Sequence, residues 1–153
     1  MKPGTGFLEH VEIDFRPLCD DSQFPENSKF LRWHRELTEA FARLGQPIVM
    51  DPNTQAMLEH LGYVDITHEE MKVPYNSWPP EGHERDVGKW LNLAVTQGLP
   101  ALSYAPFTRA LGYSKDEVDA LIEGVRRELC DRHLHSYCIL WVTRIQLHNL
   151  PRS

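Results

Sequence analysis

The sequence predicts an α/β fold, because strand-like and helix-like patterns alternate along its 153 residues. Phe7–Phe15 alternates with a two-residue period, and only Glu9 breaks the apolar face of this predicted strand. Apolar residues recur every three or four positions over residues 28–44, as on one side of a helix. The aromatic and β-branched run His135–Ile145 predicts a last strand. We therefore expect one domain over residues 1–153, in the order strand, two helices, strand, three helices, strand.

The region after the first strand predicts a loop and two helices. Leu18–Asn27 is polar and rich in turn residues, so it is expected to be a loop. Ser28 is placed to cap the first helix, and Gly45 is placed to end it. A second helix, Asn53–Leu61, is expected to begin with Asp51 as its cap.

The second predicted strand, Tyr63–Val73, is followed by a rigid exit. Gly62 separates this strand from the preceding helix, because glycine readily adopts the left-handed conformation that closes helices. Trp78 is followed by two prolines, which cannot continue a central strand. Trp78 is therefore expected outside regular secondary structure.

Residues 81–134 are predicted to be helical. Gly98-Leu99-Pro100 is expected to interrupt the first helix, and a second helix is expected over about Ala101–Leu111. Ser114 and Glu117 form a capping-box pattern, which predicts the start of a third helix.

Composition excludes several classes of function. The chain has 41% hydrophobic and 25% charged residues, as is usual for globular proteins, and a formal charge of −6 argues against a nucleic-acid partner. No apolar run is long enough to span a membrane, and the N-terminus lacks the apolar stretch of a signal peptide. Three cysteines predict reduced thiols rather than a disulfide framework. We therefore expect a cytoplasmic protein that binds neither membranes nor nucleic acids.

Five sequence motifs occur in an order that points to one family. They are Lys2-Pro3-Gly4, Gly62-Tyr63-Val64-Asp65, Trp78-Pro79, the run Gly98–Glu117, and Arg127-Glu128-Leu129 followed by His135-Ser136-Tyr137. Together they resemble the C-terminal half of the fungal LaeA-like class I S-adenosylmethionine (SAM) methyltransferases of secondary metabolism. The resemblance extends from Met1 to about Ile145.

The resemblance implies a place for each element in a Rossmann-like methyltransferase fold. The three predicted strands would be its fifth, sixth and seventh, and the seventh would run antiparallel between the other two. Residues 81–134 would be a helical insertion that helps to cover the substrate. In intact members of the family, SAM would donate a methyl group to a small-molecule secondary metabolite.

The glycine-rich loop that such a fold uses to bind SAM is not found in this chain. Gly4-Thr5-Gly6 precedes a strand instead of following one, and no helix comes after it, so a strand-entry turn is the expected structure. The sequence therefore predicts a methyltransferase-like chain without the SAM-binding half, which is not expected to bind SAM alone. Phe7–Phe15 would then be an open strand edge, able to pair with a second copy or with a methyltransferase partner.

Candidate substrate-binding residues come from the resemblance and from the positions of aromatic side chains. Asp14 and Arg16 are chosen because the end of the fifth strand lies near the substrate in the family. The aromatic and strand-start candidates are Trp33, Trp78, Trp90, His135 and Tyr137. Core packing is the alternative for Trp33 and Trp90, and Trp78 is favoured as a pocket residue because two prolines follow it. A structural hydrogen-bonded pair is the alternative for His135 and Tyr137. No catalytic residue is predicted.

Two further interpretations complete the sequence analysis. Cys130, His133, His135 and Cys138 are all zinc-type ligands, but two of them lie three apart in a predicted strand and face opposite sides, so no metal site is expected. Three functions stay open: an incomplete methyltransferase, a cofactor-independent cyclase on the same fold, and a non-catalytic partner of a full-length methyltransferase.

Overall fold

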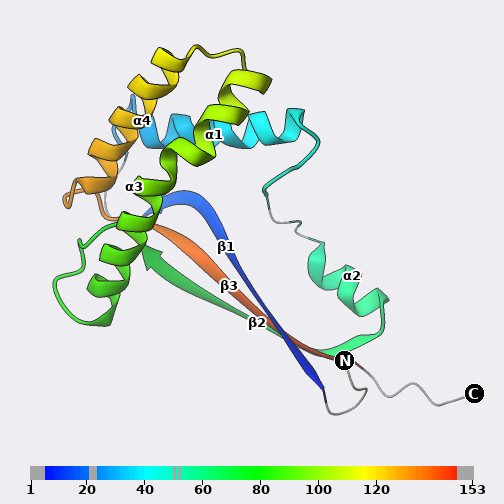
Figure 1. Ribbon diagram of the computed structural model, residues 1–153. Coiled ribbons are helices and arrows are strands. Elements are labelled where there is room, and N and C mark those ends of the chain that lie inside the picture. Colours follow the sequence, from blue (N-terminus) through cyan, green and yellow to red (C-terminus); the bar gives the residue numbers. More distant parts are fainter. Residues whose placement is uncertain (1–5, 21–23, 50, 52, 148–153) are drawn as a thin grey trace, which may run out of the picture. The chain divides into compact units, whose positions relative to one another are not determined.

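The computed structural model describes residues 6–20, 24–49, 51 and 53–147. The predicted Lys2-Pro3-Gly4 turn and most of the Gly4-Thr5-Gly6 turn lie outside the described residues. The described part forms three strands and four helices, as expected of an α/β protein (Figure 1). In chain order these are β1 (Phe7–Cys19), α1 (Lys29–Arg43), α2 (Thr54–His60), β2 (Tyr63–Pro74), α3 (His83–Ala110), α4 (Lys115–Cys130) and β3 (Ser136–Leu147).

The three strands form one antiparallel sheet in the order β1-β3-β2. β3 is the central strand, so β1 and β2 are the edges of the described sheet. Side chains link neighbouring strands: Arg144 Nε on β3 lies 2.6 Å from a Glu9 carboxylate oxygen on β1. This strand order is the one that the family resemblance implied.

The chain divides into two compact units, each with its own internal contacts. One comprises residues 1–14, 49–71 and 139–153, and the other comprises residues 15–48 and 72–138. The single-domain organisation and the limits of the helical insertion, 81–134, remain predictions.

The second unit contains a helical core formed by α1, α3 and α4, which pack against one another. Its buried apolar side chains recur at helical spacing on each helix, as the sequence predicts. The helical residues that contribute most to it include Phe30, Trp33, Leu37, Val95, Leu99, Phe107, Val118, Leu121, Val125 and Leu129. α4 begins with the predicted capping box, because Ser114 and Glu117 each bond the other's backbone N–H.

Glu128, near the end of α4, holds the first turn of α1. Its carboxylate accepts hydrogen bonds from the Ser28 hydroxyl (2.6 Å), the Lys29 N–H (2.6 Å) and the Phe30 N–H (3.2 Å). Ser28 also caps α1 directly, because its Oγ accepts from the Leu31 N–H at 3.1 Å. A carboxylate is favoured at this end of a helix, where backbone N–H groups lack partners.

The predicted helix break at Gly98-Leu99-Pro100 is wrong, because α3 continues through it to Ala110. Pro100 has no N–H, so it cannot bond the carbonyl of Thr96 four residues earlier. Arg126 of α4 supplies the missing donor: its guanidinium lies 3.2 Å from the Thr96 oxygen. A tertiary contact therefore compensates for the bond that the proline removes.

The segment after β2 is fixed tightly against α3 and α4. A Cβ added at Gly88 would lie 2.2 Å from the Asn76 carbonyl oxygen, so only glycine fits there. The Asn92 amide donates to the carbonyls of Tyr75 (3.0 Å) and Leu129 (2.7 Å). Asn76 in turn donates to the Leu134 carbonyl at 3.2 Å, which ties this segment to the turn before β3.

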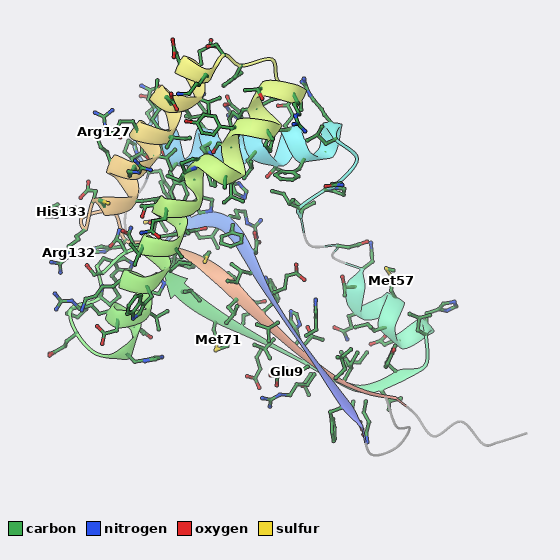
Figure 2. The ribbon with its side chains drawn as sticks, viewed as in Figure 1. Glu9, Met57, Met71, Arg127, Arg132 and His133 are labelled. Carbon is green, nitrogen blue, oxygen red and sulfur yellow. The ribbon has the colours of Figure 1, made fainter. Side chains whose placement is uncertain are left out.

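The first unit buries much less of its apolar surface. α2 has no buried residue, and Met57 and Met71, labelled in Figure 2, are both exposed. Phe7 and Val11 of β1 are 69% and 52% exposed, so the apolar face predicted for this strand is largely uncovered.

Two boundaries differ from the sequence prediction. β1 continues to Cys19, so the expected loop begins later than Leu18; Pro17 in this extension is buried. The cap of α2 is Asn53 rather than Asp51. Asp51 instead accepts a bond from the Asn53 N–H at 2.8 Å, forming a local turn before the helix.

We predict that Glu128→Gln lowers the free energy of unfolding by about 1–3 kcal/mol, because an amide replaces a charged acceptor of three hydrogen bonds. Urea unfolding followed by circular dichroism measures this change. Glu123→Gln on the exposed side of α4 is the matched control, and it should change the free energy by less than about 0.5 kcal/mol. Equal effects of the two substitutions would contradict the capping role.

Candidate functional site

Chemically versatile side chains gather in the second unit, where β1 and β2 end and β3 begins. Asp20 follows β1, Lys72 lies near the end of β2, and Tyr137 is the second residue of β3. His135 precedes β3, and Trp78 follows β2. We call these five residues the strand-end cluster. Ligands of α/β proteins bind at the carboxyl ends of parallel strands, which is where β1 and β2 end here.

Asp20 is the centre of the polar part of the strand-end cluster. Its carboxylate forms an ion pair with Lys72 and accepts a hydrogen bond from the Tyr137 hydroxyl. The Lys72 ammonium also lies 4.6 Å from the centroid of the Tyr137 ring, within cation–π range. Tyr137 is buried, whereas the side chains of Asp20 and Lys72 are more than half exposed.

The contacts with Asp20 fix the protonation states of these groups. The hydrogen bonds from Lys72 and Tyr137 hold the pKa of Asp20 below its ordinary value. The bond to Asp20 raises the pKa of Lys72. The same carboxylate, followed by burial, raises the pKa of Tyr137. Near neutral pH the cluster therefore presents a carboxylate, an ammonium and a neutral phenol.

Trp78 and His135 form the aromatic part of the strand-end cluster. Their rings stack with centroids 4.8 Å apart and planes 25° from parallel. The Trp78 indole N–H donates to the Ser136 carbonyl at 3.1 Å, and the Cys19 thiol donates to the His135 carbonyl at 3.5 Å. Trp78 lies outside regular secondary structure, as its two following prolines predicted.

This arrangement is suited to binding a ligand with both flat and polar parts. A half-buried indole–imidazole stack offers an apolar surface, and the neighbouring phenol, ammonium and carboxylate offer hydrogen bonds. Asp20 is a weak base because its carboxyl pKa is lowered, and Tyr137 keeps its proton near neutral pH because its phenol pKa is raised. These two groups are better suited to orienting a ligand than to removing a proton from it.

The other predicted substrate-binding residues lie elsewhere. Trp33 is buried in the helical core, and its indole N–H donates to the Ser103 hydroxyl at 2.8 Å. Trp90 is 72% exposed on α3. Asp14 is half-buried and Arg16 exposed, both on β1. The structure brings together Trp78, His135 and Tyr137 of the predicted set, and the substrate-binding role of all seven residues stays a prediction.

Sequence reasoning missed Asp20 and Lys72. Asp20 falls in a stretch that was expected to be a loop, and only the longer β1 makes it a strand-end residue. Lys72 is one polar residue among several in β2. Their position in the sequence could have identified these two residues, because side chains at the carboxyl ends of β1 and β2 are the ones that a ligand site of this fold would use.

The four metal-type ligands near the end of α4 make separate contacts. Cys130 is exposed and its thiol points to the Asn92 side chain at 3.8 Å, whereas buried Cys138 donates to the Val73 carbonyl at 3.7 Å. His135 stacks on Trp78, and His133 is exposed beyond the end of α4 (Figure 2). Within the described ranges, no three residues of metal-binding type come together.

The two strand-to-helix connections do not fit a glycine-rich SAM loop. The β1–α1 connection has no glycine in residues 20–28, and the N-terminus of α1 is already occupied by the Glu128 carboxylate. The β2–α3 connection has only Gly82, and the first turn of α3 carries Glu84 and Asp86, which would repel an anionic group.

Among the described helices, none is long and apolar enough to cross a membrane.

Comparison with known proteins shows what the chain is related to. It is 42% identical over 147 residues to a secondary metabolism regulator of Cochliobolus heterostrophus, covering 94% of this chain and 48% of the relative. It is 34% identical over 147 residues to a secondary metabolism regulator of Fusarium oxysporum, covering 94% of this chain and 46% of the relative. A protein-methionine methyltransferase of Chaetomium globosum is 37% identical over 139 residues, covering 90% of this chain and 44% of the relative.

The chain is related to the LaeA-like proteins. The resemblance stated from the five motifs is therefore confirmed, and the match fits the C-terminal part of a LaeA-like methyltransferase. This LaeA-like chain spans just under half the length of the relatives described above. No protein-family model and no solved structure matches it.

We predict that Asp20→Asn lowers the pKa of the Tyr137 phenol toward its ordinary value of about 10, because the carboxylate that favours the protonated phenol is lost. Tyrosinate absorbance during an alkaline titration measures the change, and the difference from Tyr137→Phe assigns the signal.

The chain offers a matched control for this titration. Asp119 of α4 accepts a hydrogen bond from Tyr104 of α3 and raises its pKa in the same way. Asp119→Asn should therefore lower the pKa of Tyr104 and leave that of Tyr137 unchanged. A Tyr137 titration that is the same with and without the Asp20 carboxylate would contradict the geometry.

Proposed function

We propose that this LaeA-like chain is the substrate-side part of a SAM-dependent methyltransferase. In this proposal β1, β2 and β3 are the fifth, sixth and seventh strands of a Rossmann-like methyltransferase sheet. The observed order β1-β3-β2, with an antiparallel central strand, supports the assignment. α3 and α4, between the last two strands, would be the helical region that covers the substrate.

The strand-end cluster is the observation that carries the proposed acceptor site. The Trp78–His135 stack would bind the flat part of a methyl acceptor, and Tyr137 and Lys72 would orient its polar groups. Methyl transfer depends largely on holding the acceptor atom in line with the methyl donor, so an orienting site suits this chemistry. SAM supplies the methyl group in intact methyltransferase relatives.

The proposed acceptor is a small molecule of secondary metabolism. Two relatives are named as regulators of secondary metabolism, which supports that biological setting. The Chaetomium relative is named for the methylation of protein methionine, so a methionine side chain is the second candidate. A thioether carries no proton to remove, which would suit a cluster whose carboxyl and phenol are both poor bases.

SAM is not expected to bind to this chain alone. The absence of a glycine-rich connection after β1 or β2 and the acidic first turn of α3 support this expectation. The exposed apolar residues of β1 support pairing with another protein surface through Phe7–Phe15. The cyclase alternative would use the same aromatic cluster without SAM. A cytoplasmic location remains part of the proposal, supported by three cysteines that form no disulfide bond in the described residues.

We predict that calorimetric titration of SAM into the folded chain gives no binding heat, because the described connections lack a glycine-rich loop. The Chaetomium methyltransferase relative is the positive control. Circular dichroism of the same sample establishes that the chain is folded. Binding with a Kd in the micromolar range, about −8 kcal/mol, would contradict the proposed division between a SAM half and a substrate half.

We further predict that Trp78→Ala weakens acceptor binding about threefold to tenfold, because an aromatic stacking contact is lost. The probes are orsellinic acid, an aromatic polyketide acid, and a short methionine-containing peptide, each followed by nuclear magnetic resonance line broadening. Trp90→Ala, which removes an exposed tryptophan of α3, is the comparison, and unchanged binding in this variant would place Trp90 outside the acceptor site.

The two probes separate the candidate acceptors. Trp78-dependent binding of the polyketide acid alone supports the small-molecule acceptor, and Trp78-dependent binding of the peptide alone supports the methionine acceptor. Equal loss of binding in Trp78→Ala and Trp90→Ala would contradict the assignment of the strand-end cluster as the acceptor site.

A further inference from the structure

The outer side of α3 is exposed although it carries no charge. Between Lys89 and Arg109 the helix has no charged side chain and no histidine. Trp90 is 72% exposed in this stretch, and Leu93 and Leu102 are 44% and 41% exposed. Exposed helix surfaces normally carry charged residues, so an uncharged side with an exposed tryptophan indicates a surface that another apolar surface covers.

Helical spacing places the exposed residues on one stripe. Trp90, Ala94, Gln97, Ala101 and Ala105 are exposed and follow one another at intervals of three or four residues. The opposite side of the helix is buried in the core of α1, α3 and α4 and contributes Val95, Leu99, Ser103 and Phe107. We call the exposed side, together with half-buried Gly98, the α3 stripe.

The α3 stripe is self-complementary in size when two copies run antiparallel. A two-fold axis between Gln97 and Gly98 pairs Trp90 of one copy with Ala105 of the other, and Ala94 with Ala101. Ala105 therefore lies opposite Trp90, and Ala94 lies opposite Ala101, so the helices can approach closely at these positions, while Gln97 lies beside the axis. Gly98 adds to this open surface, because a Cβ there would contact only Leu102, at 3.9 Å.

Charge also favours the antiparallel pairing. Asp86 lies one helical turn before Trp90, and Arg109 lies one turn after Ala105. The same two-fold axis therefore places Asp86 of one copy opposite Arg109 of the other, although Asp86 also forms an ion pair with Lys89 of its own helix at 2.7 Å. The helix dipoles are also opposed, so the positive N-terminus of one helix lies beside the negative C-terminus of its partner.

We propose that the α3 stripe is an interface with a second copy of this chain, formed by antiparallel packing of two α3 helices around Gln97 and Gly98. The interface is isologous, so each copy contributes both the large residue Trp90 and the small residue Ala105. It uses residues other than those of β1 and of the strand-end cluster.

Sedimentation of the full chain over a range of concentrations tests the proposal. The wild-type chain should form a dimer, and Ala101→Glu should raise the dimer Kd by about tenfold or more, because it places an unpaired carboxylate in the centre of the interface. Ala120→Glu is the matched control: it makes the same change at an exposed position on α4, and the dimer Kd should not change. Circular dichroism establishes that both variants are folded.

A cross-linking experiment tests the geometry of the pair. Gln97→Cys places a thiol next to the two-fold axis, so mild oxidation should give a disulfide-linked dimer in higher yield than Ala120→Cys. The wild-type chain, with its exposed Cys130, sets the background. The proposal is overturned if the wild-type chain stays monomeric at high micromolar concentration or if Ala101→Glu dimerises like wild type. Dimerisation that Val11→Lys removes but Ala101→Glu does not would place the interface on the β1 edge instead.

Discussion

The Glu128 carboxylate is the contact on which the arrangement of the helical core depends. It holds two backbone N–H groups and the capping hydroxyl at the start of α1, so the end of α4 fixes where α1 begins. The two helices also approach closely at Gly124, where an added Cβ would lie 2.6 Å from the Lys29 side chain. A polar contact at one point and a close backbone approach at another thus set the position of α1 against α4.

The same end of α4 leads into the strand-end cluster. The turn after α4 is held by the Asn76 amide, which donates to the Asp131 and Leu134 carbonyls, and β3 starts directly afterwards. His135 and Tyr137 are therefore placed by hydrogen bonds from the segment that also carries Trp78. Rigid support of this kind is what an orienting site needs, because small displacements of a bound acceptor slow methyl transfer.

Two exposed apolar surfaces in the described residues support the proposed partners. β1 carries uncovered apolar residues along a sheet edge, and the α3 stripe carries an exposed tryptophan on an uncharged helix side. The first surface fits strand pairing with a methyltransferase half, because an edge strand offers unpaired backbone groups. The second fits helix packing between identical copies, because its large and small residues match under two-fold symmetry.

The strands, most helix limits and the relation to LaeA-like proteins follow from local sequence patterns, such as alternation in β1, periodicity in α1, and the capping box of Ser114 and Glu117. Contacts between distant residues account for the remaining features. α3 continues through Pro100, and Arg126 on another helix donates a hydrogen bond to the Thr96 carbonyl, which Pro100 cannot bond. Asp20 joins Lys72 and Tyr137 only because β1 extends further than its pattern indicates and the sheet places β3 between β1 and β2. Trp33 and Trp90 show the same limit: sequence pattern identifies both as helical, but only packing buries the first and exposes the second.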